Sequence, residues 1–410
     1  MINKMIRSAI VYFFLILIIG ILLRWKMVIP IFPQLQFTYL VHAHSHVAFL
    51  GWVYFALISI LFRYVLPNDL VDTMRVRVFY YLTHVTVIGM LIAFSMQGYA
   101  PFSIAFSTLH ILVSYYFVSL YVKFRRRDLP PHLQLFFGTG VFLMALSSLG
   151  PWGLAVISSM GLAHTKLFDT FIYLYLHLQY NGWFTFIIMG TCYLMLNRAQ
   201  VQVPTRIIRW QYLAQTSSVL PSFFASILWF NLPKVLEWLG IAGALFQLIG
   251  GVLFLSLVWK PLGQLAKDKP AAIFLHASLL SLGIKALMES VGAYPEMAHM
   301  IYGSRQVILG YLHLTLIGFI SLFLLYYLGK EQKKVSALCN GSIILMIGGS
   351  IGMILLLFFA GLLEWLSFPL QSWIWILLLI TSLLIFLGLS GMTLSSFFSA
   401  ETNIRKKGQL

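Results

Sequence analysis

The chain has 410 residues, of which 60% are hydrophobic and 9% are charged, and its mean hydropathy is +0.90. This composition excludes a soluble globular protein, in which about a quarter of the residues are charged. The net charge of +16 does not indicate nucleic acid as a partner, because the basic residues lie in the loops between apolar stretches. Cys192 and Cys339 belong to no Cys-x-x-Cys pattern, so we expect no disulfide framework, c-type haem or zinc site.

Apolar stretches of about 20 residues recur along the chain without the alternation of a membrane β-barrel, and they predict helices that span a bilayer. We predict an all-α polytopic bundle of about twelve transmembrane helices, joined by short connections into a single domain over residues 1–410. In chain order the predicted spans cover residues 8–29, 39–65, 76–97, 102–123, 134–159, 168–196, 206–230, 236–259, 272–294, 304–329, 338–363 and 370–396.

The distribution of basic residues predicts the orientation of the bundle. Cytoplasmic loops of membrane proteins carry an excess of Lys and Arg, so we expect both termini to be cytoplasmic, in a bacterial inner membrane. The first span lacks a small-residue cleavage site and is predicted to be a retained helix. The basic residues assigned to the cytoplasmic side are Lys4, Arg7, Arg63, Arg75, Arg77, Lys123, Arg125, Arg126, Arg127, Arg198, Arg206, Arg209, Lys260, Lys267, Lys269, Lys330, Lys333, Lys334, Arg405, Lys406 and Lys407.

Three histidines, His42, His44 and His46, lie at the outer end of the second predicted span, where insertion into lipid does not require them. An ionisable cluster inside a span indicates function, and imidazole is a common ligand of haem iron and of other metals. His177 in the sixth span and His313 in the tenth lie at a comparable depth, because even-numbered spans all run inward and a helix rises ~1.5 Å per residue. Three spans therefore present histidine in the same half of the membrane.

The three histidines of the second span do not share one face of the helix. His42 and His46 are four residues apart and lie on one side, whereas His44 points roughly the other way. We favour His46 as an iron ligand because it lies deepest and is followed five residues later by Gly51, a spacing that the tenth span repeats. A small residue there permits close packing between helices or against a flat ligand. His44 is the close competitor, and His42 can lie near a haem propionate or in water.

These features together resemble subunit I of the haem-copper oxidase superfamily, in the branch of the nitric oxide reductases and cbb3-type oxidases. The resemblance implies a low-spin haem b between the second and tenth spans, held by His46 or His44 and by His313. It also implies that Tyr311 replaces the histidine of the family's high-spin haem, and that His177 matches one ligand of its copper or non-haem iron site. We therefore expect one haem b, or two if Tyr311 retains the second, and we do not expect copper or non-haem iron.

Other polar residues of the spans have predicted roles as well. Arg305 begins the tenth span two turns from His313 and is a predicted partner of a haem propionate, because guanidinium pairs bidentately with carboxylate. Lys285 and Glu289 are four residues apart in the ninth span. They predict an intrahelical ion pair that makes burial tolerable, and the alternative is a proton-conducting pair.

Three functions remain open from the sequence. The first is a bis-histidine b-type cytochrome in electron transfer or redox or gas sensing, with a redox subunit, a quinone or a cytochrome as partner. The second is a nitric oxide or oxygen reductase with an open haem position, in which His177 and Tyr180 line the pocket with Asn181. The third is a haem-free transporter of twelve helices, coupled through Lys285 and Glu289. The lipid bilayer is the partner common to all three.

Overall fold

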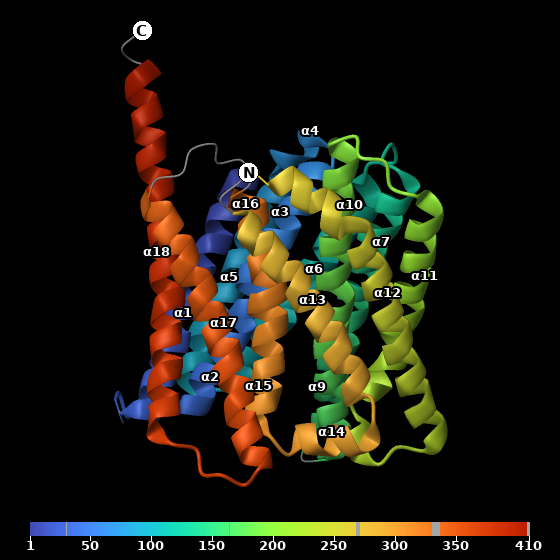
Figure 1. Ribbon diagram of the computed structural model, residues 1–410, viewed down its shortest axis with the longest axis vertical. Coiled ribbons are helices and arrows are strands. Elements are labelled where there is room, and N and C mark those ends of the chain that lie inside the picture. The colour runs from blue at the N-terminus through green and yellow to red at the C-terminus, as the bar shows by residue number, and fades with distance from the viewer. Residues whose placement is uncertain (30, 164, 268–270, 330–336, 408–410) are drawn as a thin grey trace.

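The computed structural model describes residues 1–29, 31–163, 165–267, 271–329 and 337–407, and for 337–339 and 395–407 it describes the backbone alone. Over these residues the chain forms the predicted all-α bundle, whose long helices run side by side (Figure 1). Because every backbone N–H in a helix is bonded within its own segment, such a bundle can be inserted into lipid.

The first half of the bundle contains α1 (Ile2–Val28), α2 (Phe37–His46), the π-helix η1 (Val47–Val53), α3 (Tyr54–Tyr64), α4 (Asn68–Val71), α5 (Met74–Gln97), α6 (Pro101–Phe124), α7 (Pro131–Ser147), α8 (Leu149–Ser159), α9 (Lys166–His177), the π-helix η2 (Leu178–Phe184) and α10 (Thr185–Arg198). The second half contains α11 (Thr205–Ala225), the 3-10 turn η3 (Leu228–Phe230), α12 (Lys234–Ala266), α13 (Ala272–Gly292), α14 (Pro295–Tyr302), α15 (Arg305–His313), the π-helix η4 (Leu314–Ser321), α16 (Leu322–Gly329), α17 (Ala337–Trp365) and α18 (Ser372–Lys407).

Among the described residues, eleven helices are long and apolar enough to cross a membrane, and they coincide with eleven of the twelve predicted spans. The remaining prediction, residues 168–196, corresponds to the continuous helical run of α9, η2 and α10 in the same bundle. That run is less apolar than the others, because its middle carries Gln179, Tyr180 and Asn181, all of which are buried by protein. Polar side chains inside a membrane helix are tolerated where neighbouring helices bond them.

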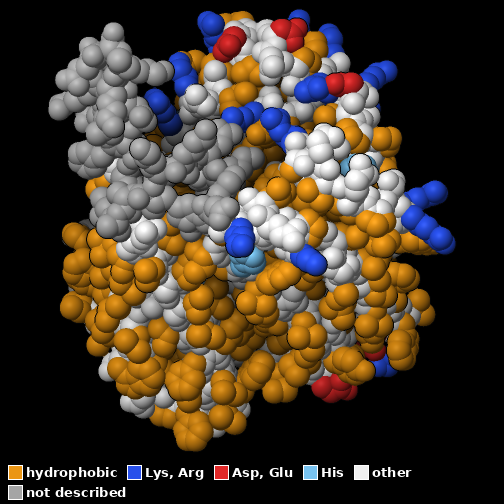
Figure 2. Space-filling view, turned by 45° about the horizontal axis from the view of Figure 1, so that its top comes forward, with side chains coloured by type: hydrophobic (Ala, Val, Ile, Leu, Met, Phe, Trp, Pro, Cys, Tyr) orange, Lys and Arg blue, Asp and Glu red, His pale blue; other side chains and the backbone are white. Residues whose placement is uncertain are grey.

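Both termini lie at the same end of the bundle (Figure 1), as the even number of predicted spans requires. Lys and Arg side chains gather over this end when it is turned toward the viewer, whereas the flanks are mostly apolar (Figure 2). The structure thus agrees with an integral membrane protein that has one basic end. Several residues named above lie outside the described set: Lys269, Lys330, Lys333 and Lys334, and also the side chains of Cys339, Arg405, Lys406 and Lys407.

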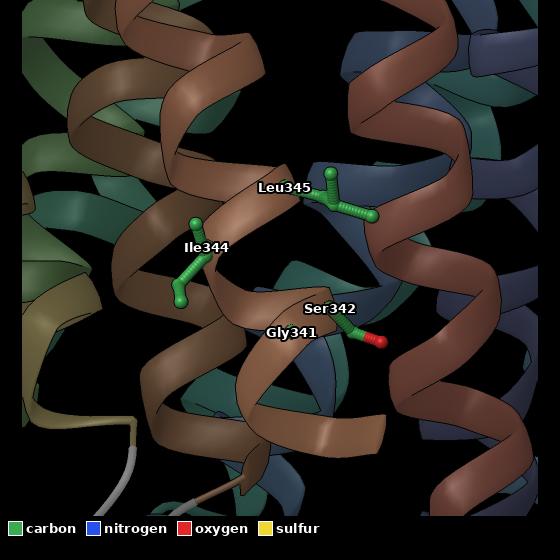
Figure 3. Close-up of a pocket in the computed structure, with 4 residues that line it drawn as sticks. All are labelled: Gly341, Ser342, Ile344 and Leu345. Atoms are coloured by element: carbon green, nitrogen blue, oxygen red, sulfur yellow. The ribbon is translucent and has the colours of Figure 1, made fainter. Parts of the chain in front are cut away.

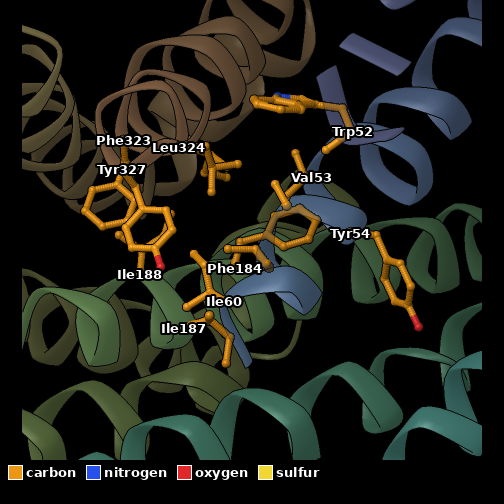
Figure 4. Packing of buried hydrophobic residues seen from close by; sticks show 14 of the residues in the cluster. Trp52, Val53, Tyr54, Ile60, Phe184, Ile187, Ile188, Phe323, Leu324 and Tyr327 are labelled. Atoms are coloured by element: carbon orange, nitrogen blue, oxygen red, sulfur yellow. The ribbon is translucent and has the colours of Figure 1, made fainter. Parts of the chain in front are cut away.

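A layer of large apolar side chains fills the bundle where the histidine-bearing helices converge (Figure 4). Trp52 of η1, Phe184 of η2 and Phe323 of α16 are at most 2% exposed. All three follow a candidate histidine along helices that run toward the terminus-bearing end. Burial of each such side chain stabilises the fold by roughly 1.5–3 kcal/mol. This apolar layer therefore separates the histidines from the basic end.

Candidate functional site

Each helix that carries a candidate histidine changes from α- to π-helix directly after it. The segment η1 follows His46, η2 follows His177 and η4 follows His313. The irregular turns are stabilised by side chains, since Thr185 donates its hydroxyl to a carbonyl of η2 and Ser321 to a carbonyl of η4, at 2.6 and 2.7 Å. π-Helical segments inside α-helices are frequently found at functional sites, so these segments direct attention to the residues that precede them.

The histidine-x4-glycine spacing occurs in all three of these helices, and not only in the second and tenth spans. The third pair, His177 and Gly182, is visible in the sequence. A Cβ added to Gly51 would lie 3.0 Å from the Tyr12 ring of α1, and Cβ atoms on Gly182 and Gly318 would come equally close to α7 and α13. These glycines therefore permit close helix packing, the first of the two roles expected for them.

His44 of α2 and His313 of α15 each have one ring nitrogen beside a backbone carbonyl. The Nδ1 atom of His44 lies 3.1 Å from the carbonyl oxygen of Ile16, and that of His313 lies 2.7 Å from the carbonyl oxygen of Leu309. In the tautomer that donates from Nδ1, each Nε2 carries a lone pair and is available to a metal. The two imidazoles lie close enough to act on each other electrostatically.

A buried arginine that the sequence analysis did not single out lies at the same place. The Arg24 guanidinium acts electrostatically on His44, His313 and Arg305. Arg24 is 9% exposed, and Nη1 makes only a long contact of 3.8 Å, to the Met27 sulfur. Over the part of the chain that the structure describes, neither Arg24 nor Arg305 pairs with a carboxylate. A buried cation without a counter-ion is costly, so this place favours an anionic group.

His42 and His46 lie on the opposite face of α2, as their spacing predicts. The His46 ring stacks on Phe94 of α5, with ring centroids 4.1 Å apart and an angle of 26°, and its Nδ1 lies 2.8 Å from the His42 carbonyl oxygen. The His42 ring contacts Tyr99 edge-on at 4.6 Å. Both rings are thus directed toward α5, away from the α1 side of the helix.

The histidine-bearing ends of the three helices pack mainly on different neighbours: α2 on α5 and α1, α9 on α8, and α15 on α17. Further along, η2 contacts η4, and Trp52 of η1 donates its indole N–H to Ser321 of η4 at 2.8 Å. The rings of His44 and His313 are enclosed by helices, yet each keeps part of its surface uncovered. Both imidazoles are therefore partly exposed.

A second polar group adjoins this site through Tyr311, which lies two residues before His313. The Tyr311 hydroxyl donates to Glu289 Oε1 at 2.5 Å, and Lys285 Nζ donates to Glu289 Oε2 at 2.8 Å, which confirms the predicted intrahelical ion pair. Asn181 donates to Oε1 at 2.9 Å, and Gln247 donates to Oε2. Donors from four helical segments thus surround one carboxylate, a set that we call the Glu289 network.

His177 belongs to the same network. Its Nε2 lies 2.7 Å from the Val219 carbonyl oxygen, and its Nδ1 lies 3.2 Å from Asn181 Nδ2, so both ring nitrogens have protein partners. The predicted association with Tyr180 is present, with ring centroids 6.4 Å apart, and Tyr180 also faces Tyr311 at 6.0 Å. Among the described residues, no three His, Cys, Asp or Glu side chains are grouped in a way that could hold a metal ion.

A hollow of about 420 Å³ lies on α17, lined by Gly341, Ser342, Ile344 and Leu345 (Figure 3). All four residues come from one helix near the terminus-bearing end, and none of them is ionisable. This hollow therefore has no chemistry in common with the histidine site.

Comparison with known proteins does not assign the chain to a group. No known protein family matches it, and no curated protein matches it. The resemblance to haem-copper oxidase subunit I therefore remains a prediction that depends on the histidines and their spans.

Proposed function

We propose that this chain is an integral membrane b-type haem protein that transfers electrons through one low-spin haem between α2 and α15. The observation that carries the proposal is the pair His44 and His313. Each imidazole is oriented by a carbonyl at Nδ1, has no hydrogen-bond partner at Nε2 among the described residues, and feels the charge of Arg24, which pairs with no carboxylate in that part of the chain. Haem-ligating histidines commonly have their second nitrogen fixed in this way.

Of the three histidines in α2, His44 is the proposed ligand. It is the one of the three that acts electrostatically on His313, whereas His46 is stacked on Phe94 and faces α5. The preference for His46 in the sequence depended on depth and on Gly51, and that glycine packs against α1. His44 also packs against a glycine, since a Cβ on Gly20 would lie 3.3 Å from its ring.

The residues at this place fit the whole cofactor as well as its iron. Arg24 acts electrostatically on both imidazoles, and the exposed Arg305 acts on Arg24; neither has a carboxylate partner among the described residues, so the two arginines would pair with the two propionates. A bis-histidine haem supplies reversible one-electron transfer at an iron with no open position. The protein would hold its axial nitrogens, neutralise its propionates and exclude water with the apolar layer.

We further propose that the basic end with both termini is cytoplasmic in a bacterial inner membrane, which places the haem in the outer half. Its electron donor would then be a quinol, or a cytochrome or partner subunit at the outer surface. A reporter enzyme that is active only outside the cytoplasm, fused to the C-terminus, should be inactive. An active fusion would reverse the orientation and leave the haem assignment unaffected.

The first test of the function is a reduced minus oxidised visible spectrum of the purified protein, with a pyridine haemochrome assay and a repeat under carbon monoxide. We expect about one haem b per chain and a sharp α-band that carbon monoxide does not shift. A carbon monoxide shift would indicate an open iron and favour the reductase alternative. A protein without haem would exclude both the cytochrome and the reductase, and it would favour the transporter.

The second test assigns the ligands. His44→Ala and His313→Ala should each abolish or convert the low-spin spectrum, because each removes one axial nitrogen. The matched control is His276→Ala on α13, whose Nδ1 also lies near a carbonyl oxygen, that of Ala272 at 2.8 Å, but at the other end of the bundle. It should leave the spectrum unchanged. Loss of the spectrum in His46→Ala with retention in His44→Ala would contradict the assignment to His44.

A further inference from the structure

We infer that the basic end of the bundle binds the headgroup of an anionic phospholipid, such as phosphatidylglycerol, where α5 begins and α6 ends. Arg75 of α5 and Lys123 of α6 would hold the lipid phosphate, and the acyl chains would lie along the outer face of the two helices. The site is separate from the histidines, and the inference does not rest on the proposed function.

Two cations from different helices lie at one aromatic ring. The guanidinium carbon of Arg75 is 5.4 Å from the centroid of the Phe124 ring, and Lys123 Nζ is also 5.4 Å from it. An aromatic ring attracts cations through its quadrupole, so Phe124 keeps the two side chains at one place. A third cation follows directly in the sequence, since the guanidinium carbon of Arg125 is 5.8 Å from the centroid of the Tyr121 ring.

The segments that carry these cations are tied to the rest of the bundle. The Tyr116 hydroxyl of α6 donates to the Arg75 carbonyl oxygen at 3.3 Å, which joins the two helices. Directly after α6, the backbone N–H of Arg126 donates to the carbonyl oxygen of Val65, at the end of α3, at 2.8 Å. The Phe124 ring packs against the hydrophobic core. The cations are therefore presented by anchored helix ends rather than by a free loop.

The acids closest to these cations in the sequence have partners of their own. Asp72 pairs with the N-terminal amine at 3.2 Å, and Asp128 pairs with Arg126 at 2.6 Å. Neither Arg75 nor Lys123 has a carboxylate partner among the described residues. The C-terminal end of α6 supplies only about half a negative charge. The place therefore keeps a net positive charge that an external anion would neutralise.

The position of the cations along the helices favours a lipid over a dissolved anion. Arg75 is the second residue of α5, and Lys123 is the second-to-last residue of α6. Of the eleven candidate spans in the described chain, α6 has the smallest buried share, and its main neighbour is α5. Val122, next to Lys123, is 56% exposed on this outer face. The cations thus lie where an apolar flank ends, which is the level of phospholipid headgroups.

The chemistry of the two side chains suits a phosphate. Guanidinium binds phosphate oxygens bidentately, and ammonium acts as a point charge beside them. Basic residues next to a membrane span attract anionic lipids in particular, because a zwitterionic headgroup brings its own cation. The combination of two unneutralised cations and an apolar outer face therefore selects a lipid with a net negative charge.

The experiment is native mass spectrometry of the detergent-purified protein with added dioleoyl phosphatidylglycerol, which measures the dissociation constant of bound lipid. The double variant Arg75→Gln with Lys123→Gln should weaken binding about 30-fold, because each basic residue near a headgroup contributes about fivefold. The matched control is Arg206→Gln with Arg209→Gln, which removes two exposed cations at the start of α11. It should change the constant by less than about twofold, because distant surface charges are screened.

Two further measurements use the wild-type protein, so they do not depend on the folding of any variant. Dioleoyl phosphatidylcholine should bind more weakly than phosphatidylglycerol, and inorganic phosphate in excess should not displace the lipid, because it has no acyl chains. Equal binding of the two lipids would overturn the inference, as would equal weakening by the two double variants. Displacement by inorganic phosphate would also overturn it, because the site would then be one for a dissolved anion.

Discussion

Replacement of Lys285 by Met tests whether the Glu289 network is an energetic unit. The substitution keeps an unbranched side chain one atom shorter than that of lysine and removes its charge. In the structure, Nζ makes the 2.8 Å ion pair with Glu289 and a hydrogen bond to Asn181. After the change, the carboxylate keeps only neutral donors, among them Tyr311 at 2.5 Å.

The expected loss of stability in Lys285→Met follows from the burial of the ion pair. Removal of one partner of a buried ion pair costs about 3–5 kcal/mol, because the remaining charge is uncompensated. Glu289 is 17% exposed and keeps its neutral donors, so we expect the lower end, about 3 kcal/mol. The double variant Lys285→Met with Glu289→Gln removes both charges and should lose only about 1 kcal/mol of hydrogen bonding. Glu289→Gln alone also leaves a buried charge uncompensated, so the double variant should be less destabilised than either single variant, which is the sign of coupling in the cycle.

The assay is unfolding of the detergent-solubilised protein, monitored by the loss of helical circular dichroism for the wild type, both single variants and the double variant. Lys234→Met is the matched control, because Lys234 also pairs with a glutamate on its own helix but is 80% exposed. It should change the free energy of unfolding by less than about 1 kcal/mol. If Lys285→Met were no more destabilising than this control, or if the single effects simply added in the double variant, the reasoning would be refuted.

Three further predictions concern the packing of the bundle. Gly243→Ala should destabilise the protein by about 1–3 kcal/mol, because the new Cβ would lie 2.6 Å from the Pro221 carbonyl carbon and force α11 away from α12. A Cβ added at Gly348 would meet no atom within 4 Å, so Gly348→Ala should instead stabilise α17 by up to about 1 kcal/mol. Thermal unfolding of the two variants measures both effects. Ser321→Ala should cost about 1–3 kcal/mol because it leaves the buried Trp52 indole N–H without a partner, and an unchanged melting temperature would contradict this.

The fold was largely predictable because membrane insertion imposes few alternatives on an apolar chain. Hydropathy located eleven spans that the structure confirms, and the basic loops placed both termini at one end. The i and i+4 spacing also placed His42 and His46 on one face and His44 on the other, as the contacts with Phe94 and Ile16 confirm. Such features depend only on residues close together in the sequence, so periodicity and composition suffice to predict them.

The assembled site was less predictable because it depends on which helices are neighbours. Arg24 lies inside the first predicted span, away from the basic end, and that position was the available signal for a buried functional cation. The Lys285 and Glu289 pair was predicted from its spacing, but the donation by Tyr311 and Asn181 from other helices was not. No pattern within one span specifies a contact with a residue of another span.

The charges inside the bundle also limit what can occupy the space near His44. The Glu289 and Lys285 pair neutralises itself, whereas Arg24 is buried without a counter-ion among the described residues, and Arg305 lies close enough to repel it. A neutral ligand would leave that repulsion in place. An occupant with two carboxylates and a metal that accepts imidazole nitrogen would satisfy both arginines and both free Nε2 atoms at once. Haem has both properties, and for this reason we favour it over a neutral transported solute at this place.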